Sequence, residues 1–152
     1  MKKILCVVMA LLLCLSAVAC GGKTSAKDPF QPAETVKALV ESGAFSGEMM
    51  EFDHKLLFQL PGEESGYEGS VVYYNMLGIS EVAAVICTAD AEQAQTVEKA
   101  LKDWVEATKT NESSYRPAEA EKLGEAIVET RGNTVLLVVA ADAAKAKAAI
   151  PE

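Results

Sequence analysis

The chain contains 152 residues, half of them apolar, and carries a formal net charge of −8. This length suffices for one domain with a single hydrophobic core. An acidic domain repels phosphate backbones and anionic headgroups, so the composition argues against nucleic acid as a partner and against direct binding to an anionic lipid surface.

The first 19 residues have the three-part layout of an export signal. Lys2 and Lys3 form a short positive region, residues 4–15 are an uncharged, leucine-rich run, and small residues follow at 16–19. The apolar run is shorter than the roughly 17–25 residues that a membrane-spanning helix needs. We therefore expect cleavage before Cys20, which removes both lysines and takes the net charge from −8 to −10.

The residues around the cleavage site, Ala17-Val18-Ala19-Cys20, resemble the lipobox of bacterial lipoproteins. That resemblance implies that Cys20 is diacylated and holds the protein on the extracytoplasmic face of the cell membrane, since two acyl chains anchor stably. Ala17 stands where a lipobox usually has leucine, and Ala17-x-Ala19 also fits an ordinary secretory site that adds no lipid. The Gly-Gly pair that follows Cys20 favours the lipoprotein.

The mature chain begins with a segment rich in Gly, Ser, Lys and Pro, which is typical of a flexible tether. We divide the chain into a signal peptide at 1–19, a tether at 20–32 and a single domain at 33–152. Pro32 suits the first position of a helix. The spacing of Val36, Leu39 and Val40 predicts a helix over 33–42, and Gly43 is a suitable stop.

The next elements are shorter. Residues 48–58 fit a short strand around Met49–Phe52, followed by a brief helix over 54–59 that Asp53 caps. Residues 61–66 have the composition of a loop. The β-branched and aromatic runs at 69–75 and 81–88 predict two strands, and the short link between them favours antiparallel pairing.

The C-terminal half carries the clearest helical pattern. Asp90 and Gln93 have the spacing of a capping box, and the apolar positions that follow predict a long helix with Trp104 as a core anchor. A second helix starts near Pro117, with these positions expected to face inward: Ala120, Leu123, Ile127 and Val128. The apolar run at 134–140 predicts a buried central strand, and Asp142 caps a last helix over 143–149.

This element order predicts an α+β fold, in which a small antiparallel or mixed sheet is packed by two or more helices. From about Val71 onward the chain resembles the bacterial lipoprotein family of the domain of unknown function 4358. The resemblance rests on three segments, which are residues 83–90, the turn Ser114-Tyr115-Arg116-Pro117-Ala118-Glu119, and Gly132-Asn133-Thr134-Val135. It implies a surface lipoprotein of Gram-positive anaerobes and brings no catalytic residues with it.

The residues that carry chemistry are few. His54 is the single histidine, and a serine-histidine arrangement would have to join it to Ser46, Ser65 or Ser70. Cys87 is the one cysteine left besides Cys20 after cleavage, and its apolar surroundings predict a buried side chain. No zinc ligand spacing, EF-hand, phosphate-binding loop or dinucleotide motif occurs. The carboxylate groups at Glu63-Glu64 and at Glu119, Glu121 and Glu125 could at most touch calcium weakly.

Four tyrosines are the remaining candidates for a binding surface. Tyr67, Tyr73 and Tyr74 surround the loop and the first long strand, and Tyr115 lies in the turn between two helices. Core packing is the favoured interpretation, and a ligand or partner surface is the alternative.

The expected function is therefore a membrane-anchored, non-enzymatic binding or interaction module without a cofactor or metal, attached through Cys20. The alternative is a cell-envelope hydrolase that uses carboxylates, which requires two acidic side chains to converge in one pocket.

Overall fold

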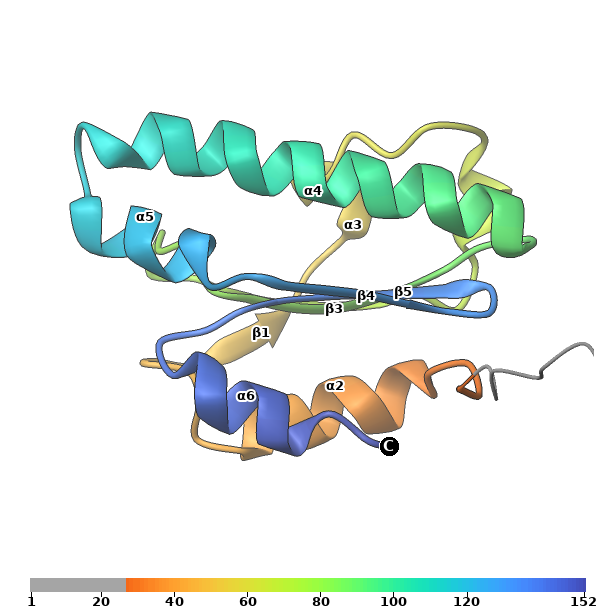
Figure 1. Cartoon of the computed structure of the whole chain (residues 1–152), viewed down its shortest axis with the longest axis horizontal. Helices are drawn as coiled ribbons and strands as arrows, with labels where there is room; N and C mark the ends of the chain where they lie inside the picture. The colour runs from red at the N-terminus through yellow and green to blue at the C-terminus, as the bar shows by residue number, and fades with distance from the viewer. Residues whose placement is uncertain (1–26) are drawn as a thin grey trace, which may run out of the picture.

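The computed structural model describes residues 27–152, so the predicted signal peptide and Cys20 lie outside the described residues. The domain consists of a five-stranded sheet between two layers of helices (Figure 1). The strands are β1 (Met49–Glu51), β2 (Val71–Asn75), β3 (Val82–Cys87), β4 (Ile127–Arg131) and β5 (Thr134–Val139). They lie in the order β1-β2-β3-β5-β4, and every neighbouring pair is antiparallel. This confirms the predicted α+β class and makes the sheet wholly antiparallel.

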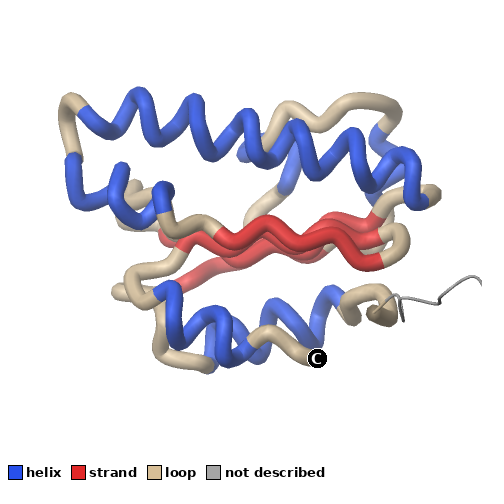
Figure 2. The backbone as a smooth tube through the Cα atoms, in the orientation of Figure 1, coloured by secondary structure: helices blue, strands red, loops and turns tan. Residues whose placement is uncertain are grey.

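The helices cover both faces of the sheet (Figure 2). One layer contains α2 (Pro32–Glu41) and α6 (Ala143–Ala149). The opposite layer contains α3 (His54–Leu57), α4 (Ala91–Ser113), α5 (Pro117–Gly124) and the 3-10 turn η1 (Glu64–Tyr67). Because both faces are covered, β3 and β5 are buried along almost their whole length, which explains their continuous apolar sequences.

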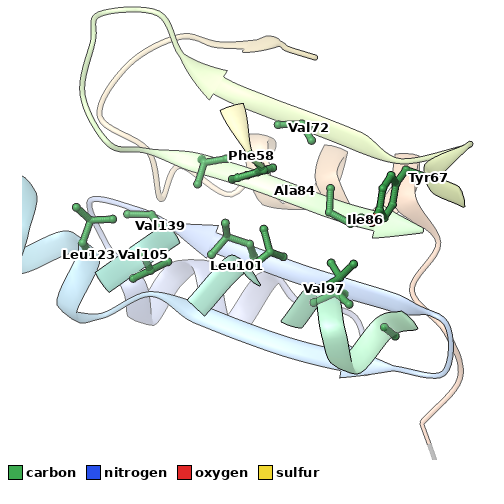
Figure 3. Close-up of a cluster of buried hydrophobic side chains, with 14 residues drawn as sticks. Phe58, Tyr67, Val72, Ala84, Ile86, Val97, Leu101, Val105, Leu123 and Val139 are labelled. Carbon is green, nitrogen blue, oxygen red and sulfur yellow. The ribbon is translucent and has the colours of Figure 1, made fainter. Parts of the chain in front are cut away.

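Successive residues of each central strand supply two separate cores. On the α4 side, Val135, Leu137 and Val139 pack with Leu101, and Figure 3 shows this cluster between α4 and the sheet. On the other side, Leu136 and Val138 pack against α2 and α6 with a set of buried side chains that includes Val36, Leu39, Ala83, Val85 and Ala146. Both layers are therefore needed to complete the fold.

The N-terminal part of the described chain packs on the domain. Phe30 is 3% exposed and its ring lies 4.1 Å from the Arg131 guanidinium carbon. The Phe30 amide also donates to the hydroxyl of Thr134, at 3.0 Å. The last residues of the segment predicted as a flexible tether are therefore packed against the domain.

The predicted second helix was wrong in its C-terminal part. The helix α5 ends at Gly124, and Ile127 and Val128 belong to β4 instead of continuing the helix. Neighbouring residues of a strand face opposite layers, so Val128 packs against the α4 core and Ile127 against the α2 core. Gly132, with φ of 55°, then allows the two-residue turn that pairs β4 with β5.

Candidate functional site

One end of the domain combines exposed apolar side chains with a buried charged cluster. We define the tip as the β2–β3 loop (residues 76–79) together with the α4–α5 turn (residues 114–116). The Arg116 side chain joins these two segments, because its guanidinium donates to the carbonyl oxygen of Gly78 and to the carboxylate of Glu112. The Nε–Oε2 distance in that ion pair is 2.6 Å. Hydrogen bonding to Arg116 also lowers the pKa of Glu112.

The tip exposes three large apolar or aromatic side chains. Met76 is 54% exposed, Leu77 is 78% exposed and Tyr115 is 87% exposed. A hollow of about 490 Å³ lies beside Tyr115, lined by that ring, Arg116 and polar side chains from the end of α4. The apolar pair Met76-Leu77 stands in a turn, where polar residues are usual, and this is the sequence signal from which the tip could have been found.

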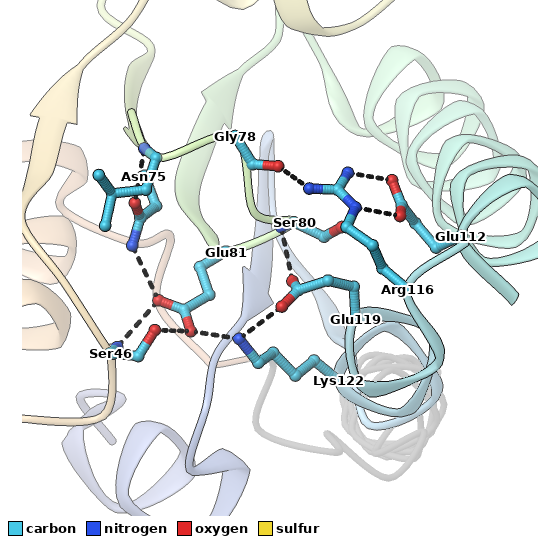
Figure 4. A network of polar contacts seen from close by, with 10 residues as sticks. Ser46, Asn75, Gly78, Ser80, Glu81, Glu112, Arg116, Glu119 and Lys122 are labelled. Carbon is cyan, nitrogen blue, oxygen red and sulfur yellow. Dashed lines mark hydrogen bonds and ion pairs between the residues drawn. The ribbon is translucent and has the colours of Figure 1, made fainter.

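Beneath the tip lies a buried ionic group, which we call the glutamate–lysine cluster: Glu81, Glu119 and Lys122 (Figure 4). Glu81 is fully buried just before β3, and Glu119 and Lys122 come from α5. The Lys122 ammonium lies 2.8 Å from a Glu81 oxygen and 3.0 Å from a Glu119 oxygen. One lysine therefore pairs with two carboxylates.

Neutral donors satisfy the remaining oxygens of the cluster. Glu81 accepts from the amide and hydroxyl of Ser46, at 2.9 and 2.6 Å, and from the side-chain amide of Asn75, at 3.2 Å. Glu119 accepts from the amide of Ser80 at 2.8 Å. The cluster thus links α5, the β2–β3 hairpin and the loop between α2 and β1, and it fixes the base of the tip.

The charges of the cluster are stabilised in place. Burial alone would raise the pKa of Glu81, but hydrogen bonds from Lys122 and Ser46 outweigh burial, so its pKa lies below the ordinary value. Burial would likewise lower the pKa of Lys122, and the bonds to Glu81 and Glu119 raise it instead. Glu81 and Lys122 are therefore both ionised at neutral pH.

The tyrosines singled out from the sequence do not form one surface. Tyr67 is buried, and its hydroxyl donates to the carbonyl oxygen of Pro61. Tyr74 faces the α4 core, where burial raises its pKa, while Tyr73 faces the α2 core. Packing therefore accounts for these three rings, as expected, and only Tyr115 of the four is exposed at the tip.

His54 does not join any of the three candidate serines through a hydrogen bond in the described chain. Its side chain is 17% exposed. The ring lies edge-on to Tyr67 at a centroid distance of 5.7 Å, and its Nε2 atom is buried without a hydrogen-bond partner. Asp53 caps the helix α3 as predicted, because its carboxylate accepts from the Lys55 amide at 2.9 Å.

The remaining candidates lie apart from the tip or have structural partners. Ser70 donates to the carbonyl oxygen of Tyr67 and accepts from the amide of Cys87. Cys87, predicted to be buried, is only partly buried, and this partial burial raises the pKa of its thiol, which favours the protonated, less reactive form. Glu64 pairs with Lys55 at 2.7 Å. Across residues 27–152, His, Cys, Asp and Glu side chains do not gather in groups of three that could hold a metal ion.

The fold and site together define a three-layer α+β domain with an exposed apolar tip above a buried ionic cluster. The chain belongs to the family of the domain of unknown function 4358, whose family model matches residues 41–140. The matched region begins earlier than the resemblance from Val71 predicted, and it includes the tip and every residue of the glutamate–lysine cluster. The chain matches no curated protein and no solved structure. In the described part of the chain, no helix has both the length and the apolar character to cross a membrane.

Proposed function

We propose that the protein is a lipid-anchored, extracytoplasmic binding module, without enzymatic activity, that contacts its partner through the tip. Cys20 carries the lipid on this proposal, because the export signal ends in a lipobox-like sequence. The domain itself is the recognition unit.

The observation that carries the proposal is the exposure of Met76, Leu77 and Tyr115 at one end of the domain. Exposed apolar side chains that are grouped, as opposed to scattered singly, mark interaction sites in soluble domains. Arg116 and the buried cluster hold both segments of the tip, which lowers the entropy that a partner must remove on binding. The tip is in this sense preorganised.

The position of the tip relative to the anchor supports the same function. Lys27, the first described residue, pairs with Glu129 at 3.1 Å, and Pro29 lies against Gly132 in the β4–β5 turn. That turn is at the opposite end of the sheet from the α4–α5 turn (Figure 1). The chain from Cys20 to Lys27 can reach at most about 25 Å. An anchored domain would therefore keep its β4–β5 end near the membrane and direct the tip outward.

The geometry gives less support to a hydrolase that uses carboxylates. Glu81 and Glu119 do converge, but Glu81 is fully buried and its oxygens already accept four hydrogen bonds. A general acid needs a raised pKa, whereas the pKa of Glu81 is lowered. The cluster is better suited to holding the tip than to protonating a leaving group.

The test is capture of envelope components by the full-length lipidated protein, compared with a Leu77→Ser/Tyr115→Ser double variant. We expect the wild type to retain a partner and the double variant to lose it while keeping its fold by circular dichroism. Leu56→Ser is the matched control, because Leu56 is 77% exposed on α3 and lies outside the tip. Full capture by the double variant would contradict the proposal.

The need for the anchor is tested separately with Cys20→Ala, which is exported without lipid. We expect this variant to bind the partner in solution but to fail in the native envelope. If the secreted form replaces the native protein completely, the anchoring part of the proposal is wrong.

A further inference from the structure

The outer edge of β1 has free backbone hydrogen-bonding groups. In the described chain β1 pairs with β2 alone, with Met50 opposite Tyr74 and Glu51 opposite Tyr73. The Phe52 amide donates to the Val72 carbonyl at 2.9 Å, so Phe52 directs its backbone groups toward β2. Because these directions alternate along an antiparallel strand, Met50 also faces β2, whereas Met49 and Glu51 direct their N–H and C=O groups outward.

The side chains along this edge are apolar and acidic. Met50 is 49% exposed, and the exposed carboxylates of Glu48, Glu51 and Asp53 lie along the same short segment. Among the ion pairs of residues 27–152, neither Glu48 nor Glu51 has a partner, and Asp53 contacts only His54, at 3.7 Å. Ion pairs of the described residues therefore leave Glu48 and Glu51 unneutralised, and Lys37, which lines the same hollow as Glu51, pairs with Glu41 at 3.9 Å.

The opposite edge of the sheet differs. In β4 the Glu129 carboxylate pairs with Lys27 and Arg131, and the Thr130 hydroxyl donates to Glu98 at 2.7 Å. Charge on that strand is thus matched within the domain. Of the two edge strands, β1 is the one whose acidic side chains lack ion-pair partners within the described residues.

We infer that the β1 edge binds an extended, basic peptide segment as an added strand. This inference rests on the proposed function and names the partner class for the surface next to the tip, since Leu77 lies against Gly47 just before β1. The outward groups of Glu51, which is exposed, supply main-chain hydrogen bonds, as in other cases of strand addition, whereas Met49 directs its groups the same way but is only 8% exposed. Lysine or arginine side chains of the peptide pair with the acidic side chains, while an apolar residue packs on Met50.

Charge also argues against a second copy of the chain as the occupant. Pairing two β1 strands would bring Glu48 and Glu51 of each copy close to those of the other, and like charges directly opposite destabilise a strand pair. Charged side chains on an edge strand are a known obstacle to self-pairing. A basic strand meets no such repulsion.

The test is fluorescence anisotropy of the purified full chain with a labelled peptide of alternating valine and lysine. We expect saturable binding that Glu51→Lys weakens by about tenfold or more, because it replaces an attraction by a repulsion. Glu121→Lys, at an exposed position on α5, changes the net charge equally and serves as the control with unchanged affinity.

A second probe leaves the protein unaltered. The same peptide, N-methylated on alternate residues along its protein-facing edge, loses the main-chain donors that strand addition requires and should not bind. Equal binding of the methylated peptide, or no binding of the unmethylated one, overturns the inference. The inference is also wrong if sedimentation analysis shows a dimer that Met50→Asp disrupts and Glu51→Lys does not. A second copy of the chain would then occupy the edge.

Failure of the strand-addition inference can be distinguished from failure of the proposed function. If the lipidated protein captures a partner through Leu77 and Tyr115 but the basic peptide does not bind, the strand-addition inference fails and the binding module stands. If the wild type captures nothing from the envelope while the peptide binds, the peptide site stands and the tip proposal fails.

Discussion

At the scale of single residues, Lys122 holds the glutamate–lysine cluster together. It supplies positive charge to both Glu81 and Glu119, and Glu81 is fully buried. Removing one partner of a buried ionic group leaves an uncompensated charge, which costs about 3–5 kcal/mol. We expect Lys122→Met to lose about that much unfolding free energy at neutral pH in urea denaturation. Lys102→Met is the control, because Lys102 forms an exposed pair with Glu98 and should change stability by less than about 1 kcal/mol.

The same variant should show a distinct dependence on pH. In the wild type the pKa of Glu81 is lowered, so its stabilising contribution is present above the unfolded pKa near 4.5 and disappears as pH falls through the folded pKa. In Lys122→Met the buried Glu81 carboxylate lacks its counter-charge and takes up a proton more readily. The deficit of the variant should therefore shrink toward about pH 4. A deficit that stays constant from neutral to acidic pH would contradict this account of the cluster.

His54 gives a second prediction at this scale. Its Nε2 atom is buried without a partner, and its ring packs on Tyr67, so nothing in the described chain prepares it for proton transfer. We expect His54→Gln to capture the same partner as the wild type in the assay described above. A folded variant that behaves like a deletion strain would make His54 a functional residue and would favour an enzyme.

Sequence reasoning succeeded for residues whose partners are near in the chain and failed for those whose partners are distant. Asp53, Asp90 and Asp142 cap helices as predicted, because a cap accepts from an amide two or three residues later. The ion pair between Glu81 and Lys122 spans 41 positions and depends on how α5 packs beside β3. No local pattern contains that information.

At the scale of elements, the helix α4 combines a confirmed prediction with a correction. Its start at Ala91 and its Asp90 cap were expected, and Gln93 accepts from the Ala89 amide at 2.8 Å, one residue before the position of a standard capping box. Trp104, expected as a core anchor, is only partly buried and packs edge-on against Phe58 at 5.1 Å. The tryptophan lies at the margin of the core.

This placement sets the expected cost of Trp104→Ala. Full burial would give about 3–5 kcal/mol, and partial exposure together with the single ring contact reduces the expectation to about 2 kcal/mol. Leu101→Ala, on the fully buried face of α4, should cost more. Urea denaturation of both variants checks the order. A larger loss for Trp104 than for Leu101 would place the ring in the core after all.

The missed strand β4 has a physical explanation. Ala120, Leu123 and Ile127 have spacings of three and four, which are typical of a helix, so the helical pattern extends past the end of α5 into β4. What decides between them is the pairing of β4 with β5 through the turn at Gly132, a tertiary interaction that the periodicity of residues 117–128 does not encode. Edge strands with partly buried residues also lack the continuous apolar run that identified β5.

At the scale of the whole molecule, the proposed anchor and the tip together predict how the domain is oriented relative to the membrane. The described chain begins at the end of the sheet opposite the tip, so attachment through the N-terminus directs the apolar side chains away from the membrane (Figure 1). The strong net negative charge keeps the rest of the surface from associating with anionic headgroups. On this proposal, recognition is confined to the tip and the adjoining edge of β1.

The anchor itself is predicted to be two acyl chains on the sulfur of Cys20. Mass spectrometry of the N-terminal peptide from protein purified out of its native membrane should show cleavage before Cys20 and the added mass of a diacylglyceryl group. Cys20→Ala supplies the unlipidated reference. An unmodified N-terminal Cys20 would mean that the signal is an ordinary secretory one.

The most direct measurement of the central claim is site-specific photo-crosslinking of the full-length protein in its own envelope. A photoreactive residue at Leu77 samples the tip, and one at Glu92, exposed in the first turn of α4 at the opposite end, samples the side that the proposal places near the membrane. The account predicts a defined adduct from position 77 and none from position 92. Adducts of equal yield from both positions, or from position 92 alone, would contradict the assignment of the tip as the contact surface.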